Sequence, residues 1–115
     1  MFTRSEDCSR REANVQKGKG IVKMKDLATK EQMYGHARLF SHVTVDPGCS
    51  IGYHTHAGET EFYYILSGEA VFSDNGKETV LHAGDVSATG YGEGHGLENR
   101  TDKPVELVAL IVLDA

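Results

Sequence analysis

The stretch GYHTHAGETEFYYILSG, Gly52 to Gly68, decides how the rest of this chain is interpreted. It carries two histidines, His54 and His56, and a glutamate, Glu61, just ahead of an apolar run. Residues i and i+2 of a β-strand point to the same face, so the two imidazoles project together. Gly58 can adopt a positive φ, and a turn there lets Glu61 point back at both rings. The stretch therefore predicts two strands whose polar side chains converge on one point.

A third imidazole, that of His95, lies between Gly94 and Gly96, where backbone can approach a site closely. Three neutral imidazole nitrogens and one carboxylate are a donor set that suits a divalent transition metal. Such a set leaves positions on the ion open to water or substrate. The spacing of the histidines fits a plain strand end with two half-exposed side chains as well as a metal site, and both interpretations stay open on spacing alone.

The composition of the chain limits its partners. Its 115 residues are enough for one domain with a single core, and 39% of them are hydrophobic. The net charge of -5 argues against nucleic acid as a partner, because no basic stripe is available to contact phosphates. No apolar stretch approaches the roughly 20 residues that span a bilayer, and residues 1–16 contain no signal-peptide segment, so we expect a cytoplasmic protein without a membrane partner. In that compartment Cys8 and Cys49 are expected to be free thiols.

Along the whole chain, the pattern predicts an all-β fold in a single domain. Short alternating or apolar segments end at turn sequences such as Asp46 to Gly48 and Asp74 to Gly76. The expected strands cover residues 21–27, 38–45, 61–66, 69–73 and 105–113. Residues 28–33 fit one helical turn, and residues 86–96 form a glycine-rich passage. Many short strands with regular turns indicate a sandwich or a small barrel.

The residues singled out so far resemble the two sequence motifs of the cupin family. The first motif is matched at every fixed position by Gly48, His54, His56, Glu61 and Gly68. The second motif is matched by Gly84, Gly92, His95 and Asn99, with Gly90 where the family usually has proline. Of these residues, Asn99 is expected to hold a turn by hydrogen bonds and not to touch a metal. The resemblance covers roughly residues 39–113.

The resemblance implies a double-stranded β-helix, or jelly-roll, cupin barrel over residues 21–115, preceded over residues 1–20 by a polar arm or an added strand. It also implies a divalent ion (Mn, Fe, Ni or Zn) that is bound by His54, His56, Glu61 and His95. Small cupins resemble one another in pairing through their sheets, so we expect a homodimer. Residues 21–27 and 105–113 would offer it strand edges and apolar surface.

Strand alternation also assigns roles to the neighbours of this site. Tyr63 faces inward with Glu61 and is either a polar group of the ligand pocket or a core tyrosine. Glu59 is expected to be a solvent-facing turn residue. His42 shares a strand face with Arg38 and is expected to point outward with a structural role.

Two classes of function remain open for such a site. The first is a metal-dependent enzyme that acts on a small oxygen-rich molecule, a carboxylate or a diol, with the ion as Lewis acid or as activator of dioxygen. The second is a non-catalytic module in which the metal holds a small ligand. The ligand set is similar to that of oxalate decarboxylases, which have an arginine three residues before the first histidine, where this chain has Ile51. Extra acid or base groups in the pocket would favour the enzyme, and apolar walls would favour the binding module.

Overall fold

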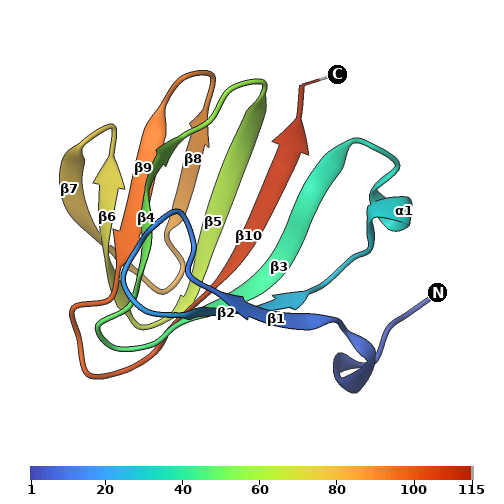
Figure 1. Ribbon diagram of the computed structural model, residues 1–115, viewed down its shortest axis with the longest axis horizontal. Helices are drawn as coiled ribbons and strands as arrows, with labels where there is room; N and C mark the ends of the chain where they lie inside the picture. The colour runs from blue at the N-terminus through green and yellow to red at the C-terminus, as the bar shows by residue number, and fades with distance from the viewer. Residues whose placement is uncertain (115) are drawn as a thin grey trace.

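Two antiparallel β-sheets pack against each other in the computed structural model, which describes residues 1–114 (Figure 1). The larger sheet has the strand order β1 (Arg10–Ala13), β2 (Val22–Asp26), β3 (Ala37–Val45), β10 (Val105–Leu113), β5 (Glu59–Ser67) and β8 (Val86–Gly90). The smaller sheet has the order β4 (Ser50–Thr55), β9 (Gly94–Glu98), β6 (Glu69–Asp74) and β7 (Lys77–His82). The helical elements are a 3-10 turn, η1 (Ser5–Asp7), and one short helix, α1 (Lys30–Met33). The all-β prediction is confirmed, and each predicted strand agrees with β2, β3, β5, β6 or β10 to within two residues at either end.

The hydrophobic core lies between the two sheets and follows the alternation of the strands. On β5, Tyr63 and Ile65 are buried, whereas Phe62 and Tyr64 are exposed. The same alternation buries Val43 and Val45 on β3. Because β10 pairs with both β3 and β5, its own inward side chains join these strands into one core.

The glycine-rich residues 86–96 form β8 and most of β9, although their composition carries no strand pattern. Glycine is unfavourable in strands by itself, but the contacts of β9 require it. A Cβ atom on Gly94 would collide with the phenol of Tyr53 on β4, and one on Gly96 would lie 3.2 Å from the backbone of Tyr53. Pairing of β9 with β4 and β6 therefore overrides the low propensity of its sequence.

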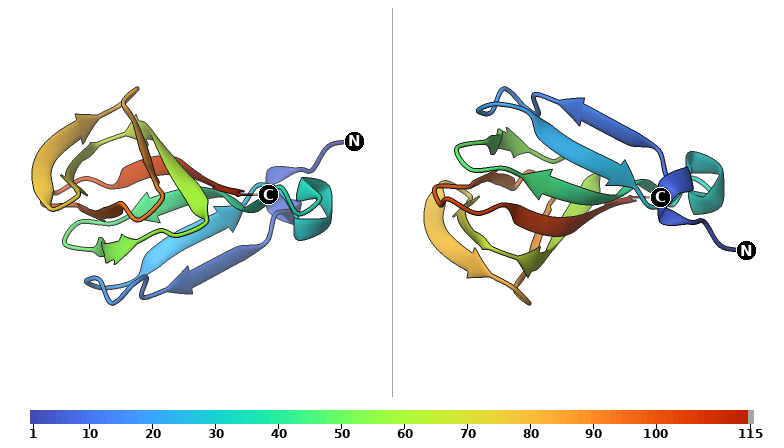
Figure 2. Two further views of the ribbon diagram at one scale, coloured as in Figure 1. Left: turned by 90° about the horizontal axis from the view of Figure 1, so that it is seen from above. Right: turned by 90° about the horizontal axis from the view of Figure 1, so that it is seen from below.

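The N-terminal segment closes one side of the barrel. Strand β1 extends the larger sheet, and the loop between β1 and β2, at the blue end of the chain in Figure 2, bonds to β4. The amide of Gly52 donates to the carbonyl of Val15 (3.1 Å), and the amide of Ser50 donates to the carbonyl of Lys19 (2.9 Å). A Cβ on Gly52 would collide with the carbonyl oxygen of Gln16, so glycine permits this close approach.

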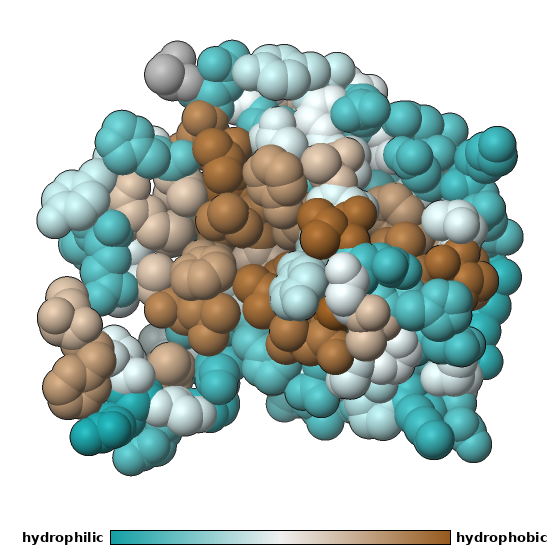
Figure 3. Space-filling model, turned by 180° about the vertical axis from the view of Figure 1, so that it is seen from behind, coloured by the Kyte–Doolittle hydropathy of each residue, from teal (hydrophilic) through white to brown (hydrophobic). Residues whose placement is uncertain are grey.

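The expectation that residues 21–27 and 105–113 offer strand edges is wrong. Strand β2 lies between β1 and β3, and β10 lies between β3 and β5, so both strands are paired on both sides. What the larger sheet does offer is an apolar outer face, where Figure 3 shows hydrophobic side chains gathered inside a hydrophilic border. Its exposed apolar side chains are Phe40 on β3, Phe62, Tyr64 and Leu66 on β5, Val86 on β8 and Val112 on β10.

None of the helices in residues 1–114 has the length and apolar character needed to cross a membrane. The α-helix α1 has four residues, and Thr29 caps its N-terminus by accepting from the amide of Gln32. Cys8 and Cys49 are both free thiols, as expected from the sequence.

Candidate metal centre

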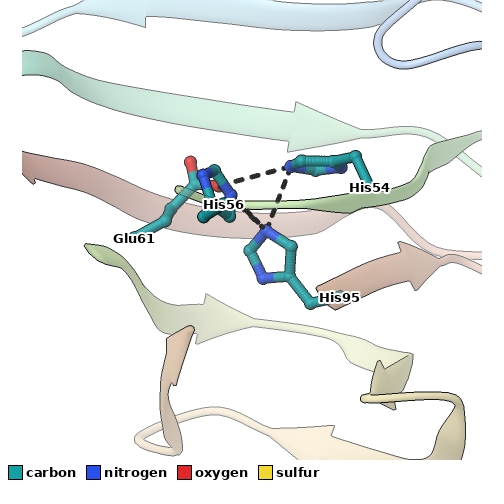
Figure 4. A group of neighbouring side chains, drawn as sticks. All are labelled: His54, His56, Glu61 and His95. Atoms are coloured by element: carbon teal, nitrogen blue, oxygen red, sulfur yellow. Dashed lines mark hydrogen bonds and ion pairs between the residues drawn. The ribbon is translucent and has the colours of Figure 1, made fainter. Parts of the chain in front are cut away.

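The structure brings together the four side chains that the spacing singled out. His54 comes from β4, His56 directly follows that strand, Glu61 lies on β5 and His95 on β9. Figure 4 shows the three imidazoles and the carboxylate pointing toward one another. Each residue offers one ligand atom, and these atoms all lie within 4.8 Å of one another. All four side chains are largely buried, so the cluster lies inside the barrel and not on its surface.

The spacing of the ligand atoms fits a bound ion. The Nε2 atom of His95 lies 3.0 Å from Nε2 of His56 and 3.2 Å from Nε2 of His54. Atom Oε1 of Glu61 lies 3.1 Å from Nε2 of His56 and 3.0 Å from Nε2 of His95. A divalent ion with ligand bonds of about 2.1 Å places neighbouring ligand atoms roughly 3 Å apart. The four donors are therefore already spaced for coordination.

Hydrogen bonds set the tautomers of two of the three histidines. Nδ1–H of His54 donates to the carbonyl of Gly52 (2.7 Å), and Nδ1–H of His56 donates to Oε2 of Glu59 (2.6 Å). Both rings consequently present an Nε2 lone pair to the centre of the cluster. Lone pairs and a carboxylate at this distance repel one another unless a cation lies between them, so the donor chemistry fits a metal.

Packing holds the third ring. The imidazole of His95 stacks on the ring of Tyr63, with the centroids 4.8 Å apart and an interplanar angle of 13°. Phe72 meets the same imidazole edge-on, with the centroids 5.8 Å apart. Tyr63 is thus both a core tyrosine and a wall of the site, which combines the two roles that the sequence left open. Such clamping keeps Nε2 of His95 aimed at the other ligand atoms.

The electrostatics of the cluster favour the protonation states that metal ligands need at Glu61 and His95, but not at His54. Burial by itself raises the pKa of Glu61, but hydrogen bonds from His54 and His95, together with the charges of His95 and His56, outweigh it and hold this pKa at about 2. Burial lowers the pKa of His95. Burial also acts to lower the pKa of His54, but bonds to Glu61 and to the Gly52 carbonyl leave it raised. The carboxylate is therefore ionised and the deepest imidazole neutral, as coordination requires.

Glu59 is not the solvent-facing turn residue that the sequence indicated. Strand β5 begins at Glu59 and not at Glu61, so the two carboxylates are i and i+2 on one face. The side chain of Glu59 is only 13% exposed and accepts from both His56 and Arg38. The two-residue alternation that paired the two histidines also applies to the next strand. A strand predicted to begin at Glu59 would have placed its carboxylate on the same face as that of Glu61.

Arg38 also departs from its expected place beside His42 on the outer face. Its Nε and Nη2 atoms donate to the two carboxylate oxygens of Glu59, each at 2.7 Å. The pairing of β10 with β3 shifts register here, so Ile111 is opposite Leu39 and Val112 is opposite Ala37. Arg38 is the extra residue of this β-bulge, and bulges re-aim side chains in this way. The Arg38–Glu59–His56 chain orients one imidazole of the cluster.

The remaining histidines lie outside the cluster. His42 is on the outer face of β3, as expected, with Nε2 3.1 Å from Oε1 of Glu106. His36 and His82 are exposed. Asn99 is fully buried and donates to the carbonyls of Val45 (2.9 Å) and Lys103 (2.6 Å), which confirms its expected role in a turn.

A cavity of about 230 Å³ adjoins the cluster. His54, His56, Glu61 and Tyr63 form part of its wall, and the N-terminal segment contributes Val15 among others. Within residues 1–114, Glu61 is the only acidic side chain that lines this cavity. Burial and the charge of Glu61 raise the pKa of Tyr63 well above 10, so its hydroxyl keeps its proton near neutral pH.

Comparison with known proteins agrees with this geometry. The family model described as "Cupin domain" matches residues 41–112. An "Oxalate-binding protein" of Thermotoga maritima is 48% identical over 114 residues, which are 98% of this chain and 94% of that protein. A crystal structure of a "predicted oxalate decarboxylase" from the same organism has 46% identity and a TM-score of 0.93, and the match covers 98% of this chain and 99% of the other. The oxalate decarboxylase of Bacillus subtilis is 37% identical over 68 residues, which span 55% of this chain and 18% of that protein.

Proposed function

This chain belongs to the cupin family, and from that premise we propose that it binds a divalent transition metal and, through the ion, a small carboxylate of the oxalate class. The observation that carries the proposal is the convergence of His54, His56, Glu61 and His95, whose donor atoms lie within 4.8 Å of one another. An ion held there would supply a Lewis-acidic centre for the oxygens of the ligand. The donor set of three imidazoles and one carboxylate suits Mn, Fe, Ni and Zn alike.

The chain's own residues position and shield this site. The Arg38–Glu59 pair holds the ring of His56, and Tyr63 with Phe72 holds the ring of His95. Burial of these groups excludes water from most of the coordination environment, which strengthens each electrostatic contact. The cavity beside the cluster gives the ligand its access and its space.

Binding without turnover is the form of this function that the cavity favours. Decarboxylation of oxalate needs a proton donor near the substrate, and Glu61 is the only acid lining the cavity within residues 1–114. The hydroxyl of Tyr63 is fully buried, and burial together with the charge of Glu61 raises its pKa. The alternative is a metal-dependent enzyme acting on the same class of molecule.

Calorimetric titration with oxalate tests the proposal. We expect one oxalate to bind per metal-loaded chain and none to bind after the metal has been removed by a chelator, with Mn²⁺, Fe²⁺, Ni²⁺ and Zn²⁺ tried in parallel. Oxalate incubated with each loaded protein should be recovered unchanged. Equal binding before and after chelation would contradict the proposal, and release of formate would favour the enzyme.

We also propose that the protein is a homodimer that buries the apolar outer face of the larger sheet. Phe62, Tyr64 and Val86 are each more than a third exposed on that face, and such a contiguous patch is typical of an interface. Light scattering should give twice the 12.6 kDa mass of the chain. The change Phe62→Lys should yield a monomer, whereas Val80→Lys on the smaller sheet should not. A monomeric wild-type protein at micromolar concentration would rule this interface out.

A further inference from the structure

The cavity beside the metal centre extends well away from the cluster. Its lining follows the register of the larger sheet: Glu61 on β5 is opposite Ile111 on β10, which is in turn opposite Leu39 on β3. Further on, Val43 on β3 is opposite Met24 on β2. The cavity therefore runs across the inner face of the sheet, from the metal ligands toward the N-terminal strands.

The walls along this path are apolar. Nine of the sixteen lining residues carry hydrocarbon or thioether side chains, and they come from the N-terminal segment and from β2, β3, β4 and β10. Met24, Val43 and Ile111 among them are less than a tenth exposed. A charged group placed against such walls loses its hydration without gaining a partner.

The cations that line the cavity are already paired. Arg38 binds both carboxylate oxygens of Glu59, and Arg11 donates from Nε and Nη2 to the two carboxylate oxygens of Asp26, each at 3.2 Å. Within the part of the chain that the structure describes, these two arginines are the only cationic lysine or arginine side chains in the lining. A second carboxylate on the ligand would therefore have to break an existing ion pair or stay unpaired.

We propose that the preferred ligand is a short monocarboxylate that bears a second oxygen on the adjacent carbon and an apolar tail, of which a 2-oxo acid is the simplest case. The inference rests on the proposed function, because the carboxylate and the adjacent oxygen bind the ion as two oxygens of oxalate would. The tail then lies against the apolar walls, where oxalate would present negative charge. With about 230 Å³ available, below the roughly 300–1,000 Å³ of drug-sized pockets, the tail is limited to a few carbons.

Titration of one metal-loaded protein with a homologous series tests this inference. The probes are oxalate, pyruvate, 2-oxobutyrate, 2-oxovalerate and 2-oxohexanoate, each added to the Mn²⁺ form in a calorimeter. Burial of each methylene should raise the affinity about fourfold, so 2-oxovalerate, with two more methylenes, should bind roughly 16-fold tighter than pyruvate. The longer 2-oxo acids should also bind more tightly than oxalate.

A variant that fills the far part of the cavity gives a second readout. Ala13 lies on β1 opposite Val22 and lines the cavity from a strand that carries none of the metal ligands. The change Ala13→Leu should lower the affinity for 2-oxohexanoate at least about fivefold and leave oxalate and pyruvate unaffected. The control is Ala83→Leu, the same substitution in an exposed turn outside the cavity.

The outcomes separate the two proposals. If oxalate binds but the affinity of the wild-type protein does not depend on tail length, the inference is wrong and the proposed function stands. If neither oxalate nor any 2-oxo acid binds the loaded protein, the proposed function is wrong and the inference falls with it. The titrations of the wild-type protein with the 2-oxo acids test the inference even if Ala13→Leu does not fold.

Discussion

His56→Ala is expected to abolish stable metal binding. Four-ligand structural zinc sites bind their ion with about 10–16 kcal/mol, so one ligand of a comparable site accounts for roughly 3 kcal/mol or more. At 1.4 kcal/mol per tenfold, the affinity should fall at least about 100-fold. The measurement is elemental analysis of dialysed protein, together with competition against a metal-binding dye. Circular dichroism on the same samples shows whether the fold survives.

A graded series makes this prediction specific to the cluster. Glu59→Gln keeps the size of the side chain and an acceptor for Nδ1–H of His56, but it removes the charge paired with Arg38. Loss of a residue that hydrogen-bonds to a metal ligand lowers metal affinity about 10–100-fold. The metal affinity of Glu59→Gln should therefore lie between those of His56→Ala and the wild type. His82→Ala removes an imidazole that is 59% exposed and should leave the metal affinity unchanged. One tightly held ion per chain in His56→Ala would show that the ligand set is wrong.

Asn99→Ala is expected to cause the largest loss of stability. The side chain donates to the carbonyls of Val45 and Lys103 and accepts from the amide and hydroxyl of Thr101. A buried polar group left without its hydrogen-bond partner costs about 1–3 kcal/mol, and Asn99→Ala removes the partner of more than one such group. We expect a loss of about 3 kcal/mol, which lowers Tm by roughly 10 °C in a chain of this size. Thermal denaturation with chelator present measures this without a contribution from the metal.

The matched control for this prediction is Asn14→Ala. Asn14 also donates to two carbonyls, those of Gly18 (2.7 Å) and Gly20 (3.0 Å), but it is exposed. Water can replace both bonds, so the loss should stay below about 1 kcal/mol. If the two variants lose similar stability, burial is not what makes Asn99 important.

Local sequence patterns correctly predicted the structural features that depend only on neighbouring residues in the chain. The apolar run over residues 105–113 predicted β10 with both ends correct, because a run of branched apolar residues favours a buried strand. Strand alternation placed Tyr63 inward with Glu61. The role of Asn99 in fixing a turn by hydrogen bonds was also expected from the motif around it.

Local rules failed where pairing between distant segments decides the outcome. The glycines of β9 have no strand propensity of their own, and their place depends on Tyr53, some forty residues earlier. Arg38 turns into the cavity because β10, about seventy residues later, shifts register against it. The position of Glu59 depends on where β5 starts, which its pairing with β10 determines through Leu113 opposite Glu59.

By itself, then, the sequence determined the all-β class and the four residues that converge, since both follow from a two-residue period and motif spacing. The tertiary structure alone decided what surrounds those residues: the Arg38–Glu59 support, the stacking of Tyr63 on His95 and the apolar course of the cavity. These features arise from the register and packing of strands that are far apart in the chain. Their energies depend on contacts that no local pattern encodes.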